Sequence, residues 1–570
     1  MKQVLIIGIA TGILATTVSG GVLAATPARD ARQELDQLDN MRRQQAIQSE
    51  VERERERERA SQQAAPVNET SGEAAKPAEA KFMISRITLL GDDNPSPKVT
   101  EILDARRDTL MGATEIMALV RDLTNYYAEN GFVTTVVVVQ PGKLNAGELT
   151  LEVKWGTIGG ITVNGKEPGF RDRTRLFSAM PFSTGKRLNM SDVDQAVDNL
   201  VRGGGDDKIR IVAGELEGTS ILDVTNTTQK MFSGSVGVNN NGRESDGWNQ
   251  YFASVGVTNL LGLNDSLSAY YSQQDYNDTR NLQQIGSASF SMPLGYWTLD
   301  ASWSGSHYEN IVGGIFGDYL STGTSSRYNF RASRVMHRDA DGKTSAYVKF
   351  GTRNSYNDIE YTPVSVSTKK YSEFGIGVSH VGQALGGWAY GDLSISAGVP
   401  WMGAAWRDDP DLAAFDMNYT KVNGMLTWNR SFQLAGMDFE YELGSGFQYS
   451  EDSLVTDARY SLGDEYTVRG FKDTAFYGAS GAYLSNTLRV PLRFNIIGGI
   501  NVTPFVGYDL GFIKTNGPQG GTDYVIGAAV GFRFSGKYFS SSLTYGWPIA
   551  APAQPQPLAK ALNYRLEARF

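Results

Sequence analysis

The carboxyl-terminal part of the chain, from about Met231 to Phe570, alternates between apolar and polar residues. The alternating segments are roughly ten residues long and are separated by clusters of Gly, Asn, Asp and Ser. Aromatic residues tend to lie near the segment ends, as they do at the two interfaces of a membrane barrel. The pattern predicts a transmembrane β-barrel, with strands over residues 235–238, 251–257, 266–273, 298–306, 345–352, 439–449 and 544–547.

The last segment of the chain shows this alternation most clearly. Its apolar positions are Leu562, Tyr564, Leu566, Ala568 and Phe570, and its polar positions are Asn563, Arg565, Glu567 and Arg569. A charged side chain that faces lipid at mid-depth costs about 2–4 kcal/mol, so the charged face is expected to line a polar lumen. A soluble sandwich also alternates, but its apolar face lies inside, and this many strands would need a second apolar layer.

The length of this region sets the size of the barrel. Roughly 340 residues, at about 21 residues for each strand and its connection, give about 16 strands, and barrels formed by one bacterial chain have an even number. A barrel of this size encloses a water-filled channel. Because an open channel would leak, another part of the chain is expected to occupy the lumen.

Residues 28–60 are the candidate for that occupant. They are polar, contain few helix breakers and include the run of alternating Glu and Arg from Glu52 to Arg59. Opposite charges three residues apart face each other along a helix. A helix that is polar nearly all round is either a solvated spacer or a segment that lies in a water-filled space. The residues assigned to a plug in the lumen are Leu35, Leu38, Met41, Arg53, Glu54, Arg55 and Glu56.

Two small domains of the same plan are expected before the barrel. The first has a strand over 83–90, helices over 97–107 and 113–130, and strands over 133–139 and 149–153; the second repeats this order over 158–163, 171–179, 191–202, 209–212 and 220–224. Ser191 and Asp194 resemble a capping box at the last helix. Such a unit leaves an edge strand exposed, which can bind an extended peptide as a further strand. The alternative is that the two domains serve only as spacers.

The first 25 residues have the features of a cleaved export signal. Lys2 precedes an apolar stretch from Val4 to about Val18, and residues 22–25 offer small side chains at a cleavage site. A retained membrane helix is the alternative, but small polar residues dilute the stretch. No later run reaches the roughly 20 apolar residues that a spanning helix needs. The chain is therefore expected to be exported and to cross a membrane with strands.

Composition excludes several classes of function. The 570 residues contain no Cys, which excludes disulfides, iron–sulfur clusters and a thiol nucleophile. The formal net charge of −9 argues against nucleic acid as a partner. The histidines, His307, His337 and His380, lie far apart in the sequence, and no Gly-rich phosphate loop with Lys is present. We therefore expect no metal, no cofactor and no enzymatic activity.

The segment from Leu462 to Phe471 carries a family resemblance. Its tetrad of Val468, Arg469, Gly470 and Phe471 resembles the signature of the outer-membrane transporters built from POTRA domains and a 16-stranded barrel. The resemblance implies that the tetrad lies on an extracellular loop folded back into the lumen. It also implies that the arginine meets an acid on a strand with a Phe-x-Asp-x-Gly motif.

Asp509 and Gly511 supply the acid and the final glycine of that motif, whereas Gly507 stands in place of the phenylalanine. In a partly wet lumen, a pair of Arg469 with Asp509 is expected to contribute only about 1 kcal/mol. Its role would then be to position the loop rather than to stabilise the barrel.

Two POTRA-like domains and an amino-terminal helix narrow the resemblance to two-partner secretion transporters (TpsB type) of the haemolysin and filamentous-haemagglutinin kind. Residues 130–135 with 147–149 resemble the end of their first POTRA domain, residues 194–200 with 218–220 resemble their second, and residues 240–242 resemble the start of their barrel. The resemblance implies α+β periplasmic POTRA domains followed by an all-β 16-stranded transmembrane β-barrel with an N-terminal plug helix.

The chain is therefore expected to divide into six parts. They are a signal peptide (1–25), a charged plug helix (26–60), a linker rich in Ala, Glu, Pro and Gln (61–81), POTRA 1 (82–155), POTRA 2 (156–226) and the barrel (227–570). The expected location is the bacterial outer membrane, with the POTRA domains in the periplasm.

The implied function is export of an unfolded secreted protein, such as an adhesin, a haemolysin or a contact-dependent inhibition toxin. The POTRA domains would recognise this large exoprotein and the barrel lumen would export it. The other expected partners are outer-membrane lipid and the barrel assembly machinery, which would recognise the terminal Phe570; a monomer is expected. The alternatives are an outer-membrane protein assembly factor and a porin-like passive diffusion channel.

Overall fold

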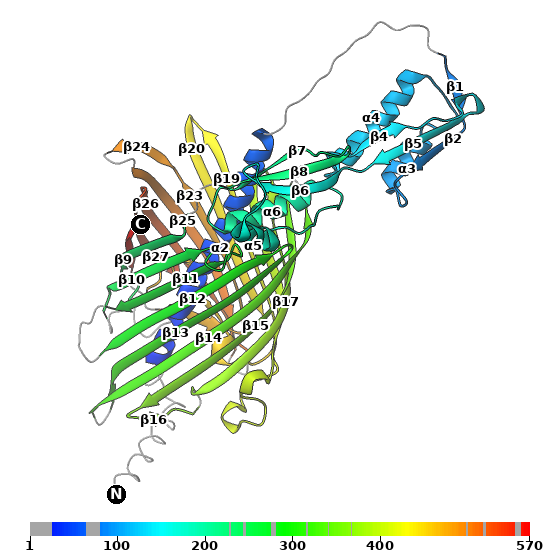
Figure 1. The fold of residues 1–570 in the computed structure, drawn as a ribbon. Helices are drawn as coiled ribbons and strands as arrows, with labels where there is room; N and C mark the ends of the chain where they lie inside the picture. Colours follow the sequence, from blue (N-terminus) through cyan, green and yellow to red (C-terminus); the bar gives the residue numbers. More distant parts are fainter. Residues whose placement is uncertain are drawn as a thin grey trace.

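The computed structural model consists of a β-barrel, a long helix inside it, and two small α/β domains at one end (Figure 1). It describes residues 26–63, 80–226, 230–242, 247–274, 281–314, 317–339, 341–365, 367–472, 474–496, 500–516, 520–552 and 560–570. The expected signal peptide and residues 64–79 of the expected linker lie outside the described residues. No helix in the described ranges combines the length and the apolarity needed to cross a membrane.

Sixteen long strands of the described chain close into an antiparallel barrel. In chain order they are β9 (Phe232–Asn239), β10 (Gln250–Thr258), β11 (Ser266–Gln274), β12 (Leu282–Leu294), β13 (Trp297–Gly314), β14 (Gly317–Arg338), β15 (Gly342–Ile359), β17 (Lys369–Ala384), β18 (Gly387–Gly398), β19 (Thr420–Leu434), β20 (Met437–Tyr449), β23 (Ser480–Arg489), β25 (Ile500–Lys514), β26 (Thr522–Ser535), β27 (Phe539–Ala550) and β28 (Ala561–Arg569). Short pieces, β16 (Thr362–Pro363) and β24 (Leu492–Ile496), extend two of the hairpins. Residues 235–239 of β9 pair with 565–569 of β28 and close the wall. The predicted sixteen-stranded barrel is confirmed.

The two faces of the barrel wall differ as the alternation predicts. On β28, Leu562 and Leu566 are exposed on the outside, whereas Arg565 and Glu567 line the lumen. Short turns, such as those between β17 and β18 and between β19 and β20, lie at the end that carries the small domains. The long connection of residues 450–479 between β20 and β23 therefore starts at the opposite end, because neighbouring strands are antiparallel.

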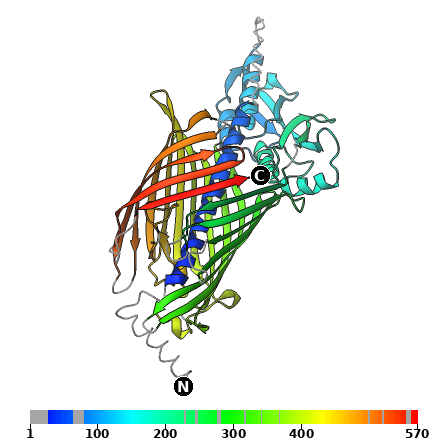
Figure 2. The ribbon, with the colours of Figure 1, turned by 90° about the vertical axis from the view of Figure 1, so that its left-hand side faces the viewer.

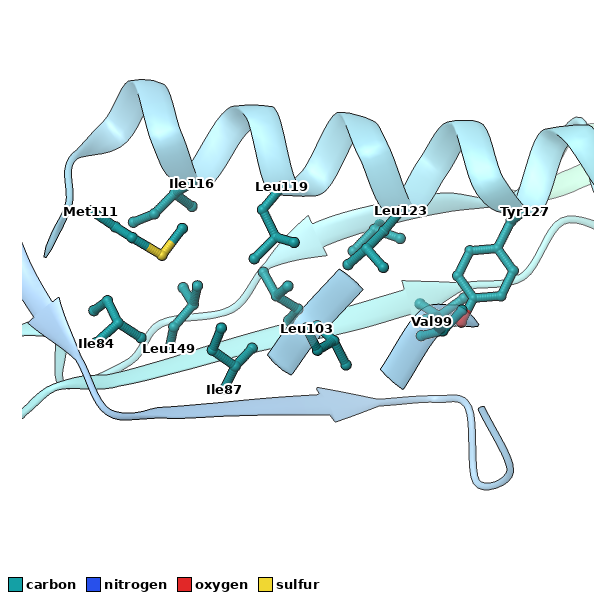
Figure 3. Close-up of a cluster of buried hydrophobic side chains, with 13 residues drawn as sticks. Ile84, Ile87, Val99, Leu103, Met111, Ile116, Leu119, Leu123, Tyr127 and Leu149 are labelled. Carbon is teal, nitrogen blue, oxygen red and sulfur yellow. The ribbon is translucent and has the colours of Figure 1, made fainter. Parts of the chain in front are cut away.

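The first small domain packs one long helix on a sheet of mixed direction. Its elements are β1 (Phe82–Ile84), β2 (Arg86–Leu90), α3 (Pro97–Asp104), β3 (Thr109–Met111), α4 (Ala113–Glu129), β4 (Val136–Val139), the 3-10 turn η1 (Leu144–Ala146) and β5 (Glu148–Lys154). The sheet has the order β2-β5-β4, which leaves β4 at an edge. α4 presents Ile116, Leu119, Leu123 and Tyr127 to the core, at the three- and four-residue spacing of one helical face (Figure 3).

The first strand of this domain differs from the prediction. Residues 83–90 were expected to form one strand, but the structure breaks this strand at Ser85 into β1 and β2. The break is caused by pairing, because β1 pairs with the short strand β3 while β2 pairs with β5. One continuous strand and two separate strands would show the same alternation of apolar and polar residues, so the sequence does not distinguish them.

The second small domain repeats the plan and lies against the barrel. It contains β6 (Thr157–Val163), α5 (Phe170–Ala179), α6 (Met190–Arg202), β7 (Lys208–Ala213) and β8 (Thr219–Thr225), with sheet order β6-β8-β7. The expected capping box at Ser191 and Asp194 is wrong. Asn189 is the N-cap, and its side chain accepts a hydrogen bond from the Ser191 amide at 2.8 Å. Asp194 instead forms an ion pair with Arg57 at 2.7 Å.

The helix α2 (Thr26–Gln63) runs along the inside of the barrel from one end to the other (Figures 1 and 2). At about 1.5 Å per residue, 38 residues extend about 57 Å, which exceeds the roughly 30 Å of a bilayer core. The helix is therefore long enough to fill the lumen and still reach the second small domain.

The core of the first small domain should depend strongly on Leu119, which is fully buried between helix and sheet. We expect Leu119→Ala to lower the free energy of unfolding of this domain by about 2–5 kcal/mol, because it removes buried methyl groups and leaves a cavity. Hydrogen exchange of the full chain would measure this as faster exchange within residues 82–154. Met117→Ala is the matched control, because Met117 lies on the exposed face of the same helix. Equal exchange in both variants would contradict the assignment of this core.

Candidate functional site

The helix α2 contacts the lumen wall through two small apolar clusters. In the first, Leu35 and Leu38 are buried against Ile285 of β12, with the half-buried Met41 beside them. The second cluster consists of Ile47, Val51, Val381 and Trp388. Ile47 and Val51 were not among the predicted plug residues, although their spacing of four residues on an otherwise polar helix is the signal that could have found them.

Polar contacts hold the middle of the helix. Arg327 of β14 donates to Asp36 and Asp39, with an N–O distance of 2.7 Å to each carboxylate. These acids are three residues apart, so both side chains project from one face of the helix toward the same guanidinium. Glu34 is buried and accepts hydrogen bonds from Gln250 and Gln274 of the wall.

A larger ion-pair cluster joins the helix to the second small domain and to the turn between β14 and β15. Arg338 lies 3.0 Å from Glu54 of α2 and 2.9 Å from Asp198 of α6. Lys343 lies 3.4 Å from Glu54 and 3.0 Å from Asp198. Three further residues, Glu50, Arg53 and Arg202, complete the cluster. The same two cations of the barrel turn therefore serve carboxylates of both the helix and the small domain.

The surrounding cations lower the pKa of Asp198. Burial by itself would raise the pKa of this carboxyl, but Lys343, Arg202, Arg338 and Arg53 surround it and hold its pKa well below the usual range. Oxygens of Asp198, Glu50 and Glu54 also lie within 4.8 Å of one another, a spacing that could hold a metal ion. Because Lys343 and Arg338 already neutralise these oxygens, the geometry fits an ion-pair cluster better than a cation site.

The charged residues assigned to the plug have different surroundings. Arg53 and Glu54 belong to the cluster described above, and Glu54 is almost fully buried. Arg55 donates to the side-chain oxygen of Asn429 on β19. Glu56 is exposed. Of residues 52–57, the part of the run whose side chains the structure describes, only some therefore contact the wall, because a straight helix turns its residues in different directions.

The helix also contacts the long loop between β20 and β23, which folds inward. Asn40 donates to the Asp464 carboxylate at 3.0 Å, and Gln44 donates to the Tyr466 carbonyl at 3.1 Å. The Asp464 carboxylate in turn accepts hydrogen bonds from the Tyr466 amide and from the amide and hydroxyl of Thr467. The plug helix and the loop that carries the tetrad are thus in direct contact.

The structure brings Arg469 and Asp509 together. Asp509 on β25 accepts from the Arg469 backbone amide at 2.9 Å, from its Nε at 2.7 Å and from its Nη2 at 2.6 Å. Ser485 donates to the same carboxylate at 2.9 Å. Asp509 is fully buried and Arg469 is 8% exposed. The pair is thus more buried than the expected value of about 1 kcal/mol assumed, and the loss of one partner would leave an uncompensated buried charge, at a cost of about 3–5 kcal/mol.

Glycines on the barrel wall let the loop approach closely. A Cβ at Gly507 would lie 2.4 Å from the Arg469 guanidinium, and one at Gly527 would lie 1.8 Å from the Arg469 carbonyl oxygen. The Arg469 guanidinium therefore occupies the space that a side chain at position 507 would take. Gly527 was missed by the sequence analysis, since an isolated glycine in a strand gives no sign of what approaches it.

The other members of the tetrad fix the loop against the wall. Val468 and Phe471 are buried in a cluster with Leu462, Phe476, Ile513 and Val525. Gly470 has a φ of +102°, and a Cβ there would lie 2.5 Å from the Trp547 carbonyl oxygen, so only glycine fits. A Cβ at Gly511 would already lie 3.0 Å from Val468, so this glycine makes room for the valine.

Beside the helix, the lumen keeps a cavity of about 1390 Å³. Charged side chains of both signs line it, among them Arg331, Lys349, Glu373, Asp392 and Lys421. This wall is polar and wide, which suits the passage of an extended chain better than the binding of one small molecule.

Comparisons with known proteins agree with this geometry. A POTRA domain model of the ShlB type matches residues 82–156, and a second POTRA domain model matches residues 157–212. The chain is 31% identical over 464 residues to the outer membrane transporter CdiB of Dickeya dadantii (strain 3937), an alignment that covers 80% of each protein. It is 28% identical over 542 residues to the hemolysin transporter protein ShlB of Serratia marcescens, covering 94% of this chain and 92% of that one.

The solved structure of CdiB from Escherichia coli has the same fold. It superposes with a TM-score of 0.82 at 24% identity, over 96% of this chain and 100% of that chain. The family model for the haemolysin secretion/activation protein ShlB/FhaC/HecB matches residues 218–534. This match spans more than half of the 570 residues, and the chain therefore belongs to the haemolysin secretion/activation protein family ShlB/FhaC/HecB.

Proposed function

We propose that this chain is the outer-membrane transporter of a two-partner secretion system and exports an unfolded partner protein through its barrel. The barrel lies in the outer membrane, and the two POTRA domains lie in the periplasm. The observation that carries the proposal is the plug: a segment of the same chain fills the lumen and is held mainly by ion pairs and hydrogen bonds. Water and a passing chain can replace such contacts, so the plug can leave without unfolding the wall.

The POTRA domains offer the docking surface for the partner. The edge strand β4 of the first POTRA domain pairs with one strand of its sheet, β5. The side chains of Val136 and Val139 on β4 are exposed. An extended segment of an exoprotein can add to such an edge, where backbone hydrogen bonds give affinity and side chains give selectivity. An adhesin, a haemolysin and a contact-dependent inhibition toxin all fit this description of the partner.

The remaining assignments complete the proposal. The division of the chain is that of the sequence analysis, with an export signal over 1–25, the plug over 26–60, the linker over 61–81, POTRA domains over 82–155 and 156–226, and the barrel over 227–570. The transporter acts as a monomer without enzymatic activity. Lipid contacts the outer face of its barrel, and the barrel assembly machinery recognises Phe570. Folding of the partner outside the cell gives the transport its direction.

A porin-like channel and an assembly factor are the competing functions. A porin-like function would account for the barrel. Passive diffusion needs neither the POTRA domains nor the buried pair of Arg469 and Asp509, here called the arginine clamp. An assembly factor would share the tetrad, but the two POTRA domains matched here resemble a two-partner secretion transporter more than a general assembly factor. Secretion of a co-expressed partner separates these functions, because a porin would support solute permeation alone.

The edge strand β4 provides a test of partner docking. We expect Val136→Lys combined with Val139→Lys to reduce secretion of a co-expressed partner strongly, because lysines on an edge strand oppose the addition of another strand. An immunoblot of the culture medium measures this, and small-solute permeation should stay unchanged. Met117→Lys is the control, since Met117 is exposed on the helix of the same domain. Undiminished secretion by the double variant would exclude docking at this edge.

The arginine clamp provides a second test. Arg469→Ala should abolish secretion while the barrel still assembles, because the inward loop loses its anchor on Asp509. Arg469→Lys should restore little, since an ammonium cannot replace the planar donor fork. Secreted partner and the heat-modifiable mobility of the barrel are measured together. Arg407→Ala is the control, because Arg407 is an exposed loop arginine bonded to Asn418. Normal secretion by Arg469→Ala would remove the proposed role of the tetrad.

If the helix plugs the lumen, weakening its contacts should change the conductance of the purified protein. Glu50→Gln combined with Glu54→Gln should increase the open fraction in a planar bilayer, because Arg338 and Lys343 lose counter-charges that the helix supplies. A loss of about 3 kcal/mol of ion-pair energy would shift the closed-to-open ratio by more than a hundredfold. Deletion of residues 28–60 sets the upper limit, and Ser49→Ala, an exposed helix position, is the control. If the deletion leaves conductance unchanged, the helix is not a plug.

A further inference from the structure

The helix α5 of the second POTRA domain exposes two large aromatic side chains. Phe170 is 84% exposed and Phe177 is 72% exposed, and they are the most exposed phenylalanines in the part of the chain that the structure describes. They are seven residues apart, which places them two turns apart on one face of the helix. Neither belongs to the edge strands, the plug contacts or the arginine clamp.

The opposite face of α5 is fixed to the barrel. Asn264, in the turn between β10 and β11, donates to the Arg175 carbonyl and to the Ser178 hydroxyl, at 2.8 Å each. The Gly295 amide, in the turn between β12 and β13, donates to the Ser178 carbonyl at 2.8 Å. Arg175 also forms a buried ion pair with Asp207 of its own domain. These buried contacts fix the orientation of α5 relative to the barrel.

The barrel continues the apolar surface next to this helix. Leu260 and Leu261 lie in the turn between β10 and β11, and are 52% and 59% exposed. A Cβ at Gly262 of the same turn would lie 3.2 Å from the Thr174 hydroxyl of α5, so turn and helix are in contact. On β10 itself, Val255 is exposed on the outer, lipid-facing side. The apolar positions therefore run from the lipid-facing wall, over the turn, to α5.

The position of α5 in the molecule agrees with an apolar surface that continues from the barrel wall to the helix. The helix lies against the end of β12 that carries the POTRA domains (Figure 1). In the second view, the second POTRA domain lies beside the upper end of the barrel, at the right of the picture (Figure 2). Because the barrel strands end and turn at this rim, we expect the head groups of the periplasmic leaflet to meet the barrel there.

Basic residues flank the two phenylalanines. Arg171 and Arg173 are exposed on α5, between Phe170 and Phe177. Arg173 is bent back to donate to the Pro168 carbonyl at 3.1 Å, which leaves its other nitrogens toward water. A short helix with aromatic side chains beside exposed arginines matches the chemistry of a phospholipid surface, where rings enter the acyl boundary and guanidinium groups meet phosphates.

We propose that α5 is a membrane anchor: Phe170 and Phe177 insert into the periplasmic leaflet of the membrane that holds the barrel, and Arg171 and Arg173 contact its phosphate groups. The anchor holds the second POTRA domain against the membrane plane while the first remains free to meet a partner. This inference requires the barrel to lie in a membrane, and it does not depend on what the barrel exports.

The absence of cysteine from the sequence makes a direct test possible. Single variants Phe170→Cys and Phe177→Cys of the full chain are labelled with a nitroxide and reconstituted into vesicles of phosphatidylcholine and phosphatidylglycerol. We expect collisions of both labels with oxygen to exceed those with a water-soluble nickel chelate, as for a label at the acyl boundary. Met117→Cys is the matched control, since Met117 is an exposed apolar residue of the first POTRA domain; its label should behave as in water.

Three outcomes would overturn the anchor. The labels at 170 and 177 could have the water-like accessibility of the control. They could be protected by a second copy of the chain, which would appear as dipolar coupling between labels. They could also become protected only after a secreted partner is added, which would make the face a docking site for that partner. Because the measurement uses no secretion assay, its failure leaves the proposed export function untouched.

Discussion

The polar lumen is the constraint on which the rest of this molecule depends. A barrel wide enough for an extended chain must carry charged side chains inside, because its apolar positions face lipid. Those charges need partners when nothing is in transit, and the amino-terminal helix supplies them with Asp36, Asp39, Glu50 and Glu54. The helix is polar nearly all round for the same reason: the wall that it contacts is itself polar and charged.

The same cations link parts of the chain that lie far apart in the sequence. Arg338 and Lys343 on one barrel turn bind Glu54 of the plug and Asp198 of the second POTRA domain. Departure of the helix would leave Asp198 as their carboxylate partner within this cluster. The plug and the POTRA domain therefore share one electrostatic site. At the far end of the lumen, Asn40 and Gln44 bind the inward loop in a comparable way.

Much of the fold was predictable from local pattern. Alternation gave the strands of the barrel and the inward side of Arg565 and Glu567, and helical spacing gave α4 and its core. Predictions that depended on distant partners were less complete. Residues 83–90 formed two strands because two different strands pair with them. The helix expected to start with a capping box at Ser191 is capped by Asn189, and Asp194 binds a residue of the plug.

The sequence by itself determined the alternation that predicts the barrel strands and, from the length of that region, their number, because these are local properties of the chain. The pairing of Arg469 with Asp509 was implied by the resemblance to a family motif. Only the tertiary structure decided how deeply that pair is buried and that its guanidinium fills the space above Gly507. It also decided which charges of the Glu-Arg run meet the wall. Burial and charge pairing depend on what lies across the lumen, and one segment's composition does not contain that information.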